Sequence, residues 1–168
     1  CRQPRRFAGC AGAGYAVTAT EPSEFWEARY AGQPQVWSGR VNRMFAEVVG
    51  QFAPGRALDL GCGEGGDAVW LAEHGWTVTA VDISATAVER GRGAAVERGV
   101  ADRIEWVAAD LGSWRTDARF DLVTASFLQS PVSLPRGQIL RAAAELVAPG
   151  GHILIVAHAA PPPWASQL

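Results

Sequence analysis

The chain has 168 residues, a formal net charge of −2, 48% apolar residues and 19% charged residues. These values predict one globular domain with a sizeable core, and the charge argues against a nucleic-acid or membrane-surface partner. No apolar run approaches the roughly 18 to 20 residues that span a bilayer, so no membrane partner is expected.

The cysteines are Cys1, Cys10 and Cys62. They are too few and too scattered for a disulfide framework, and their spacing does not suit a metal site. We therefore expect a reducing, cytoplasmic location and no metal.

The first third of the chain contains two candidate helices. Residues 1–20 show no clear period and lack the apolar region of a secretory signal, so they are predicted to be a disordered lead-in or expression remnant, or alternatively a short helix. The segment Glu24–Tyr30 is predicted to form one or two helical turns with Ser23 as the N-cap. An amphipathic helix is expected over Val41–Phe52, where apolar residues recur at helical spacing.

From residue 57 onward, strand-like and helix-like segments alternate. The predicted strands are Ala57–Leu60, Thr77–Asp82, Ile104–Ala108, Phe120–Ala125 and His152–Ala157, and the predicted helices are Gly65–His74, Ala85–Arg98 with Ser84 as its cap, and Pro135–Val147. Pro149–Gly151 is expected to be a turn, and Pro161–Pro163 is expected to run as polyproline. Such alternation predicts an α/β fold, a doubly wound, mostly parallel sheet with helices on both faces.

The stretch that follows the first predicted strand is rich in glycine. Gly61, Gly63 and Gly65 have no Cβ, so the backbone can adopt positive φ and a ligand can lie against it. The next helix would point free N–H groups at the same place. Gly61, Gly63 and Gly66 also match the dinucleotide pattern G-x-G-x-x-G. This turn is therefore a candidate nucleotide cradle, at the strand ends where such sheets bind ligands.

Two acidic residues end neighbouring strands. Asp82 lies about 20 residues beyond the turn, where a carboxylate can accept hydrogen bonds from a ribose diol; the alternative is an ordinary helix-start acid beside Ser84. Asp110 can accept from an exocyclic adenine amine, while the Leu111 N–H can donate to a ring nitrogen. The alternative for Asp110 is a cap on the turn Gly112–Trp114.

Asp59 and Cys62 are the other chemically notable residues near the turn. Asp59 lies inside an apolar strand, and a buried carboxylate needs partners. We expect N–H groups of the turn to supply them, although a contact with the ligand's ammonium is also open. For Cys62 the backbone is expected to matter more than the thiol, since nothing nearby suggests a lowered pKa.

Five motifs in order over residues 57–157 resemble those of the S-adenosylmethionine-dependent methyltransferases of the Rossmann-like class. They are Leu58–Gly65, Val78–Ser84, Ala109–Leu111, Phe120–Val123 and Leu146–Leu154. Two further segments, Phe25–Tyr30 and Trp37–Asn42, resemble the N-terminal lid of the small tellurite-resistance and thiopurine-type methyltransferases.

The resemblance implies S-adenosyl-L-methionine as cofactor and S-adenosyl-L-homocysteine as product. It places Gly61, Gly63 and Gly65, with Cys62 between them, at the methionine part, Asp82 and Ile83 at the ribose, and Asp110 and Leu111 at the adenine. Ser126 and Phe127 would flank the methionine end and the donor methyl, and Tyr30 and Trp37 would close over the sulfonium, unless these aromatic residues serve only core packing. A cation near an aromatic face gains about 0.5 to 2 kcal/mol.

Together, the composition, the predicted elements and the resemblance divide the chain into four parts. They are a lead-in over residues 1–20, a lid and helix over 21–55, a Rossmann-like core over 56–160 and a proline-rich tail over 161–168.

The chain departs from the family pattern in two ways. Relatives often carry a histidine after the fourth strand, where this chain has Phe127-Leu128-Gln129. Relatives also have seven strands, whereas only five are predicted here, without the usual C-terminal strand hairpin. The sequence is thus either a fragment or one whose sheet edge is completed by a partner, for example in a homodimer.

The expected reaction is in-line methyl transfer to a small-molecule acceptor, in which the protein mainly aligns and desolvates the reactants. A general base is needed only when the acceptor must lose a proton; His158, beyond the fifth strand, is the candidate, with a surface histidine as the alternative. No other catalytic residue is assigned. Two other functions are open: an NAD(P)-binding oxidoreductase and a non-catalytic, ligand-binding methyltransferase fold.

Overall fold

The structure, a computed structural model, describes residues 21–158. Its helices are α1 (Pro22–Ala31), α2 (Arg43–Val49), α3 (Gly66–Glu73), α4 (Ala85–Glu97) and α5 (Arg136–Glu145), with a short 3-10 turn at Ala101–Arg103; its strands are β1 (Arg56–Leu60), β2 (Thr77–Asp82), β3 (Ile104–Ala108), β4 (Phe120–Ser126) and β5 (Val147–Val156). The parts of the chain predicted as a lead-in and a proline-rich tail lie outside the described residues.

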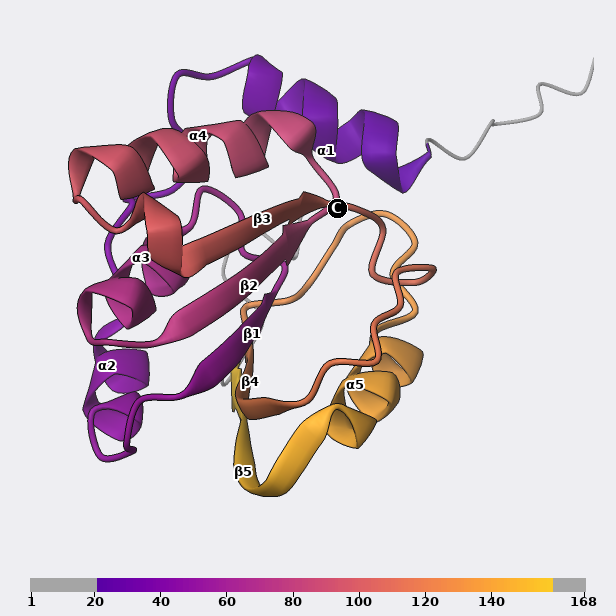
Figure 1. The fold of residues 1–168 in the computed structure, drawn as a ribbon. Coiled ribbons are helices and arrows are strands. Elements are labelled where there is room, and N and C mark those ends of the chain that lie inside the picture. Colours follow the sequence, from indigo (N-terminus) through magenta and orange to yellow (C-terminus); the bar gives the residue numbers. More distant parts are fainter. Residues whose placement is uncertain (1–20, 159–168) are drawn as a thin grey trace, which may run out of the picture.

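The five strands form one sheet in the order β3-β2-β1-β4-β5, and every neighbouring pair is parallel. The chain leaves β1 toward β2 and β3, then returns to the other side of β1 for β4 and β5. The point where the order reverses therefore lies between β1 and β4, and the turn after β1 is beside it (Figure 1). This confirms the predicted Rossmann-like, doubly wound sheet.

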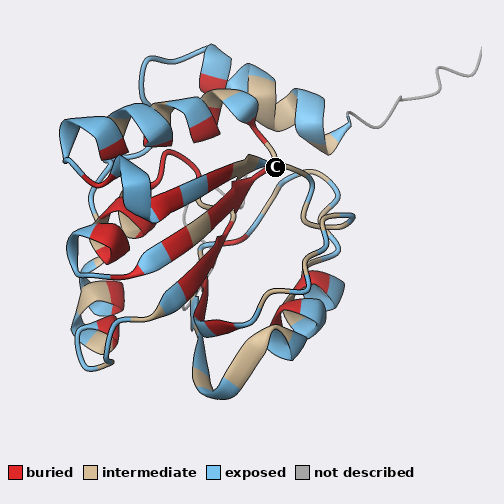
Figure 2. Ribbon diagram, viewed as in Figure 1, coloured by how far each residue is buried: buried red, intermediate tan, exposed pale blue. Residues whose placement is uncertain are grey.

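Helices cover both faces of the sheet, as predicted. Residues of α2, α3 and α4 pack on one face, around Ala57, Val78 and Trp106. The other face packs Leu58, Val81, Phe120 and Val123 against Ile139 and Ala143 of α5. Successive residues of β1 thus serve opposite cores, as the two-residue period of a strand requires. Figure 2 shows that buried residues are concentrated in the central strands.

The helix starts in the first third differ from the prediction. Helix α1 begins at Pro22 with Glu21 as its N-cap, so Ser23 lies inside the helix and its assignment as the cap was wrong. Proline suits the first helical position because its missing N–H would have no intrahelical partner there. Helix α2 is shorter than predicted, since the Asn42 side chain accepts from the N–H groups of residues 44 and 45 and so fixes the start at Arg43.

The segment Pro149–Gly151 was predicted as a turn before the last strand, which was wrong. It lies within β5, because Val147 already pairs with Phe120 ahead of the glycines. The next pairing joins Leu122 to His152, so the extra residues form an irregularity in the ladder rather than a separate turn. Gly150 adopts a φ of 80° there, which a residue without Cβ can do.

Two surface properties of this fold bear on function. Among residues 21–158, no helix has both the length and the apolar character needed to cross a membrane. Within the same residues β5 is an edge strand, and its Ile153 and Ile155 side chains are 41% and 43% exposed.

Candidate cofactor site

The turn after β1 has the backbone that was predicted for it. Gly61, Gly63 and Gly65 have φ values of 70°, 52° and 82°. The N–H groups of Gly61 and Cys62 donate to the carbonyl of Val81 at 2.8 and 3.1 Å, which fixes the turn against β2. A side chain would be strained at these φ values, and it would also need room: a Cβ on Gly61 would lie 2.7 Å from a terminal methyl of Leu128, which would have to move.

Asp82 faces this turn from the end of β2. One carboxylate oxygen accepts from the Gly63 N–H at 2.8 Å and the other from the Ser84 N–H at 3.0 Å. Burial raises the pKa of Asp82, while those two hydrogen bonds oppose the rise. Asp82 therefore joins the glycine turn to the start of α4, where the Ser84 hydroxyl caps the helix as predicted by accepting from the N–H of Ala87.

Asp59 is 2% exposed, and its partner is not the one predicted. Its carboxylate accepts from the Thr124 hydroxyl of β4 at 2.9 Å, so it holds β1 to β4 through a side chain rather than binding N–H groups of the turn. The pKa of Asp59 is raised to about 8, first by burial and then by the nearby charge of Asp67. The buried carboxylate thus favours its protonated form.

Asp67 and Glu64 are two acids of this region that sequence reasoning missed. Asp67 lies in the first turn of α3 and accepts from the backbone N–H of Asn42 at 3.2 Å; burial raises its pKa. Glu64 lies within the glycine turn itself, with 8% of its surface exposed. The only sequence signal was the presence of acids next to a glycine turn, which does not reveal partners 25 or more residues away.

Asp110 lies at the carboxyl end of β3 with an exposed side chain. One of its carboxylate oxygens accepts from the Gly112 N–H at 2.8 Å, and its carbonyl accepts from the N–H groups of Ser113 and Trp114. Asp110 therefore caps the turn Gly112–Trp114, which was the alternative role considered for it. Leu111 is partly buried beside it, packed against the core that α5 covers.

Tyr30 and Trp37 lie over the glycine turn. The Trp37 indole N–H donates to the Tyr30 hydroxyl at 2.8 Å, and a Cβ on Gly63 would lie 3.0 Å from that hydroxyl. Tyr30 is 3% exposed, whereas Trp37 is 49% exposed and so is not a core residue. Burial, followed by the charge of Asp82, raises the pKa of Tyr30 well above its ordinary value.

Ser126, Phe127 and His158 lie at the carboxyl ends of β4 and β5. Phe127 has a φ of 52°, which is uncommon for a bulky residue, and residues in such strained conformations cluster at active sites and ligand clamps. The Phe127 and His158 rings are 4.6 Å apart between centroids, and both residues are exposed. The Ser126 hydroxyl is buried and makes no hydrogen bond of good geometry among residues 21–158, but it lies near enough to the Asp67 carboxylate to oppose the rise in the pKa of Asp67 that burial causes.

The predicted residues therefore gather along one edge of the sheet, at the carboxyl ends of its strands. Cys62 is part of the turn, and burial raises the pKa of its thiol, as expected for a residue that acts through its backbone. Ile83 is partly buried directly after Asp82. The site combines a glycine turn with positive φ values, acids at two strand ends, and an aromatic cover.

Comparison with known proteins identifies the family. Residues 57–151 match the family model described as a methyltransferase domain. The "2-heptyl-1-hydroxyquinolin-4(1H)-one methyltransferase" of Mycobacteroides abscessus is 38% identical over 108 residues, which are 61% of this chain and 45% of that protein. The "Ribosomal RNA small subunit methyltransferase C" of Alcanivorax borkumensis is 34% identical over 62% of this chain and 33% of its own length. The chain therefore spans less than half of either relative.

Solved structures share the fold. A SAM-dependent methyltransferase from Geobacter sulfurreducens in complex with S-adenosyl-L-homocysteine is 23% identical, with a TM-score of 0.61 over 76% of this chain and 53% of that one. TehB from Haemophilus influenzae is 18% identical, with a TM-score of 0.63 over 77% of this chain and 44% of its own. The family model covers more than half of the chain and includes the glycine turn and the ends of β2 and β3, so this protein belongs to the methyltransferase domain family.

Proposed function

We propose that this protein binds S-adenosyl-L-methionine across the turn after β1 and transfers its methyl group to a small-molecule acceptor. The observation that carries the proposal is the arrangement at the carboxyl edge of the sheet. Three glycines with positive φ form a cradle, and Asp82 and Asp110 end the two strands on one side of it. Nothing in the comparisons supports the alternative of an NAD(P)-dependent oxidoreductase.

Each part of the edge suits one part of the cofactor. The backbone of Gly61, Cys62, Gly63 and Gly65 would hold the methionine part. Asp59 is 2% exposed and bonded to Thr124, so it would reach the ammonium group through a water molecule. A second group would hold the nucleoside: Asp82 and Ile83 at the ribose, and Asp110 and Leu111 at the adenine. Asp82 retains lone pairs beyond its two backbone hydrogen bonds, since an ionised carboxylate offers about four acceptor sites.

The acceptor would enter beside Trp37 and Phe127, which are large, partly exposed aromatic side chains near the turn and at the end of β4. The buried Ser126 hydroxyl at the end of β4 would face the methionine end. Aromatic surfaces favour a flat apolar acceptor. We propose an aromatic hydroxyl compound, and the name of the 38% identical relative supports that class.

S-adenosyl-L-methionine supplies an activated methyl group, so the protein needs only to align the acceptor, exclude water and accept a proton. His158 is the proposed base, because it lies exposed beside Phe127 at the carboxyl end of β5.

The test combines cofactor binding with turnover. Isothermal titration should show micromolar S-adenosyl-L-homocysteine binding and no binding of NAD or NADP, and labelled S-adenosyl-L-methionine should transfer label to phenols or hydroxyquinolones. Binding without turnover on small molecules or on ribosomal RNA fragments would favour a non-catalytic fold. Stabilisation by NAD(P) alone would overturn the proposal.

The remaining proposals concern organisation. Residues 21–55 would act as a lid and helix over the core of residues 56–160, the protein would act in the cytoplasm without a nucleic-acid substrate, and a second copy would pair along the β5 edge. The exposed Ile153 and Ile155 support that pairing. Light scattering would decide it: a dimer that Ile155→Lys converts to a monomer supports the proposal, and a wild-type monomer contradicts it.

A further inference from the structure

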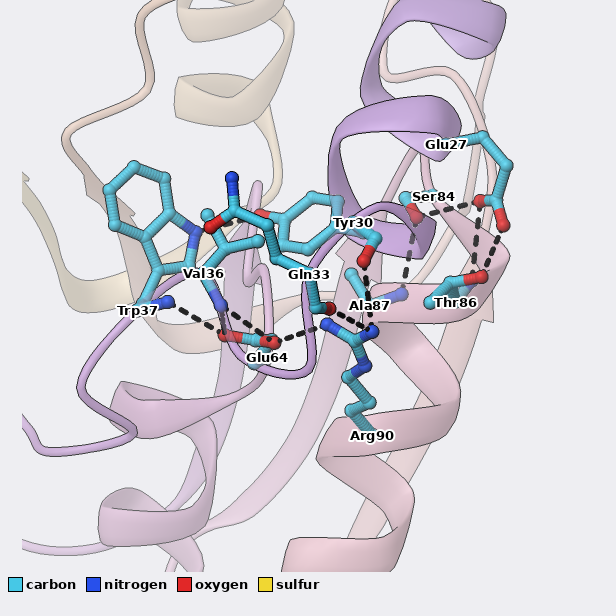
Figure 3. Close-up of polar contacts among 10 residues, drawn as sticks. All are labelled: Glu27, Tyr30, Gln33, Val36, Trp37, Glu64, Ser84, Thr86, Ala87 and Arg90. Carbon is cyan, nitrogen blue, oxygen red and sulfur yellow. Dashed lines mark hydrogen bonds and ion pairs between the residues drawn. The ribbon is translucent and has the colours of Figure 1, made fainter.

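The segment between α1 and α2 is tied to the glycine turn by partly buried polar contacts (Figure 3). Within the turn, the Glu64 carboxylate accepts from the backbone N–H groups of Val36 and Trp37, at 3.1 and 2.8 Å. These two N–H groups belong to residues 32–42, which we call the strap. The strap therefore contacts the turn through a charged side chain that is itself part of the turn.

Arg90 of α4 completes the arrangement. One guanidinium nitrogen donates to Glu64 at 2.8 Å, and the other donates to the carbonyls of Tyr30 and Gln33 at 2.9 and 2.6 Å. Arg90 thus holds both the acid that binds the strap and the backbone at the start of the strap. Hydrogen bonds with an ionised partner are about twice as strong as neutral ones, and Glu64 is only 8% exposed, which limits screening by water.

The strap places the aromatic cover. Trp37 follows Val36 directly, and its indole N–H is bonded to the Tyr30 hydroxyl over Gly63. These contacts hold Tyr30 and Trp37 over the turn, at 3.0 and 3.3 Å from the place where a Cβ on Gly63 would lie. A cofactor that lies along Gly61–Gly65 would therefore contact this cover.

Helix α1 has a separate attachment. Glu27 accepts from the Ser84 hydroxyl at 2.7 Å and from the hydroxyl and N–H of Thr86, at the start of α4. This attachment lies beside the strap contacts without sharing a residue with them (Figure 3). Opening at Glu64 can therefore leave α1 docked while the strap moves between Gly32 and Gly39, the latter at a φ of 66°.

We propose that Glu64 and Arg90 are positioning residues that latch the strap over the cofactor site and set how fast the cofactor exchanges. The part that concerns the cofactor rests on the proposed function, whereas the latch is a property of the protein alone. Glu64 and Arg90 act through Tyr30 and Trp37 rather than on the reacting atoms. Their loss should thus affect cofactor exchange and affinity rather than the chemical step.

Amide hydrogen exchange of the ligand-free protein tests the latch directly, since the Val36 and Trp37 N–H groups are the ones that Glu64 binds. We expect Glu64→Gln and Arg90→Met to speed exchange in residues 32–42 at least tenfold, with unchanged exchange in β1. The matched control is Arg98→Met, which removes an ion pair between the C-cap of α4 and α3 (Arg98 to Glu73, 2.9 Å), eight residues along the chain from Arg90. Unchanged exchange in the strap, or equal acceleration throughout the chain, would overturn the proposal.

Stopped-flow dissociation of S-adenosyl-L-homocysteine tests the consequence for the cofactor. Glu64→Gln and Arg90→Met should raise the dissociation rate at least tenfold, while Arg98→Met leaves it unchanged. A wild-type rate in both latch variants would overturn the role in exchange. If the wild-type protein binds no S-adenosyl-L-homocysteine, the proposed function fails, and the hydrogen-exchange result still decides the latch.

Discussion

Two glycines of α4 should respond to alanine in opposite directions. Gly91 is buried against the Trp106 ring of β3: a Cβ there would lie 2.4 and 2.5 Å from two ring atoms. Gly93, two residues further along, has nothing within 4 Å of a Cβ. The same ring also lies 2.4 Å from a Cβ on Gly65, so it supports the glycine turn from below.

The size of each effect follows from propensity and packing. Alanine in place of glycine in a helix interior gains roughly 0.8 to 1 kcal/mol, and Gly93→Ala should gain up to that amount. Gly91→Ala gains the same propensity but must displace the Trp106 ring, which is 8% exposed and held between α4 and the turn. Overpacking costs about 1 to 3 kcal/mol. An approach of 2.4 Å corresponds to the upper end of this overpacking cost. The free energy of unfolding of Gly91→Ala should therefore fall by about 1 to 2 kcal/mol after the gain in helix propensity is subtracted.

Urea denaturation followed by circular dichroism measures both variants against the wild type. The free energy of unfolding should rise for Gly93→Ala and fall for Gly91→Ala, with unchanged denaturant slopes. A Gly91→Ala protein as stable as the Gly93→Ala protein would refute the packing of Trp106 between α4 and the turn.

Three further predictions concern the site. Because the pKa of Asp59 is about 8 in the fold against an ordinary 3.8, the folded protein keeps a proton that the unfolded chain loses, so the free energy of unfolding should fall as pH rises from about 4 to 8. Urea unfolding at pH 5 and pH 8 should show the fall, and Asp59→Asn should reduce it, with a remainder from Asp67 and Asp82, whose pKa values burial also raises. Gly63→Ala should weaken S-adenosyl-L-homocysteine binding about tenfold in titration, since its methyl would strain a φ of 52° and press on Tyr30 and Trp37; wild-type affinity would contradict the close cover. Hydrogen bonds from the hydroxyls at the start of α4 lower the pKa of Glu27. The stabilisation that Glu27 contributes should therefore be present above about pH 4.5 and lost in acid. The melting temperature measured between pH 3 and 6 should depend less on pH in Glu27→Gln than in the wild type.

The sequence predicted the sheet well because its signals are local. The strands Thr77–Asp82 and Ile104–Ala108 have the predicted bounds, since each apolar run is bounded by turn or capping residues. The glycine turn was also predictable, because residues without Cβ are needed wherever φ is positive and a backbone lies close to a neighbour.

Long-range polar partners could not be predicted in this way. Asp59 binds Thr124, 65 positions along the chain, and Glu64 binds Arg90 and the strap. An acid in an apolar stretch indicates that the folded protein must supply hydrogen-bond partners for it. Which groups supply them depends on the strand order and on how the helices pack. The helix start was also missed: the Asn42 side chain caps α2, so the helix begins at Arg43 rather than at the predicted Val41.

A crystal structure of the protein soaked with S-adenosyl-L-homocysteine is the most direct test of the central claim. The account predicts the nucleoside along the turn at Gly61–Gly65, with an Asp82 oxygen about 2.7 Å from a ribose hydroxyl and the adenine beside Asp110. A nucleoside bound elsewhere, or an Asp82 that still contacts only Gly63 and Ser84 in the complex, would contradict it.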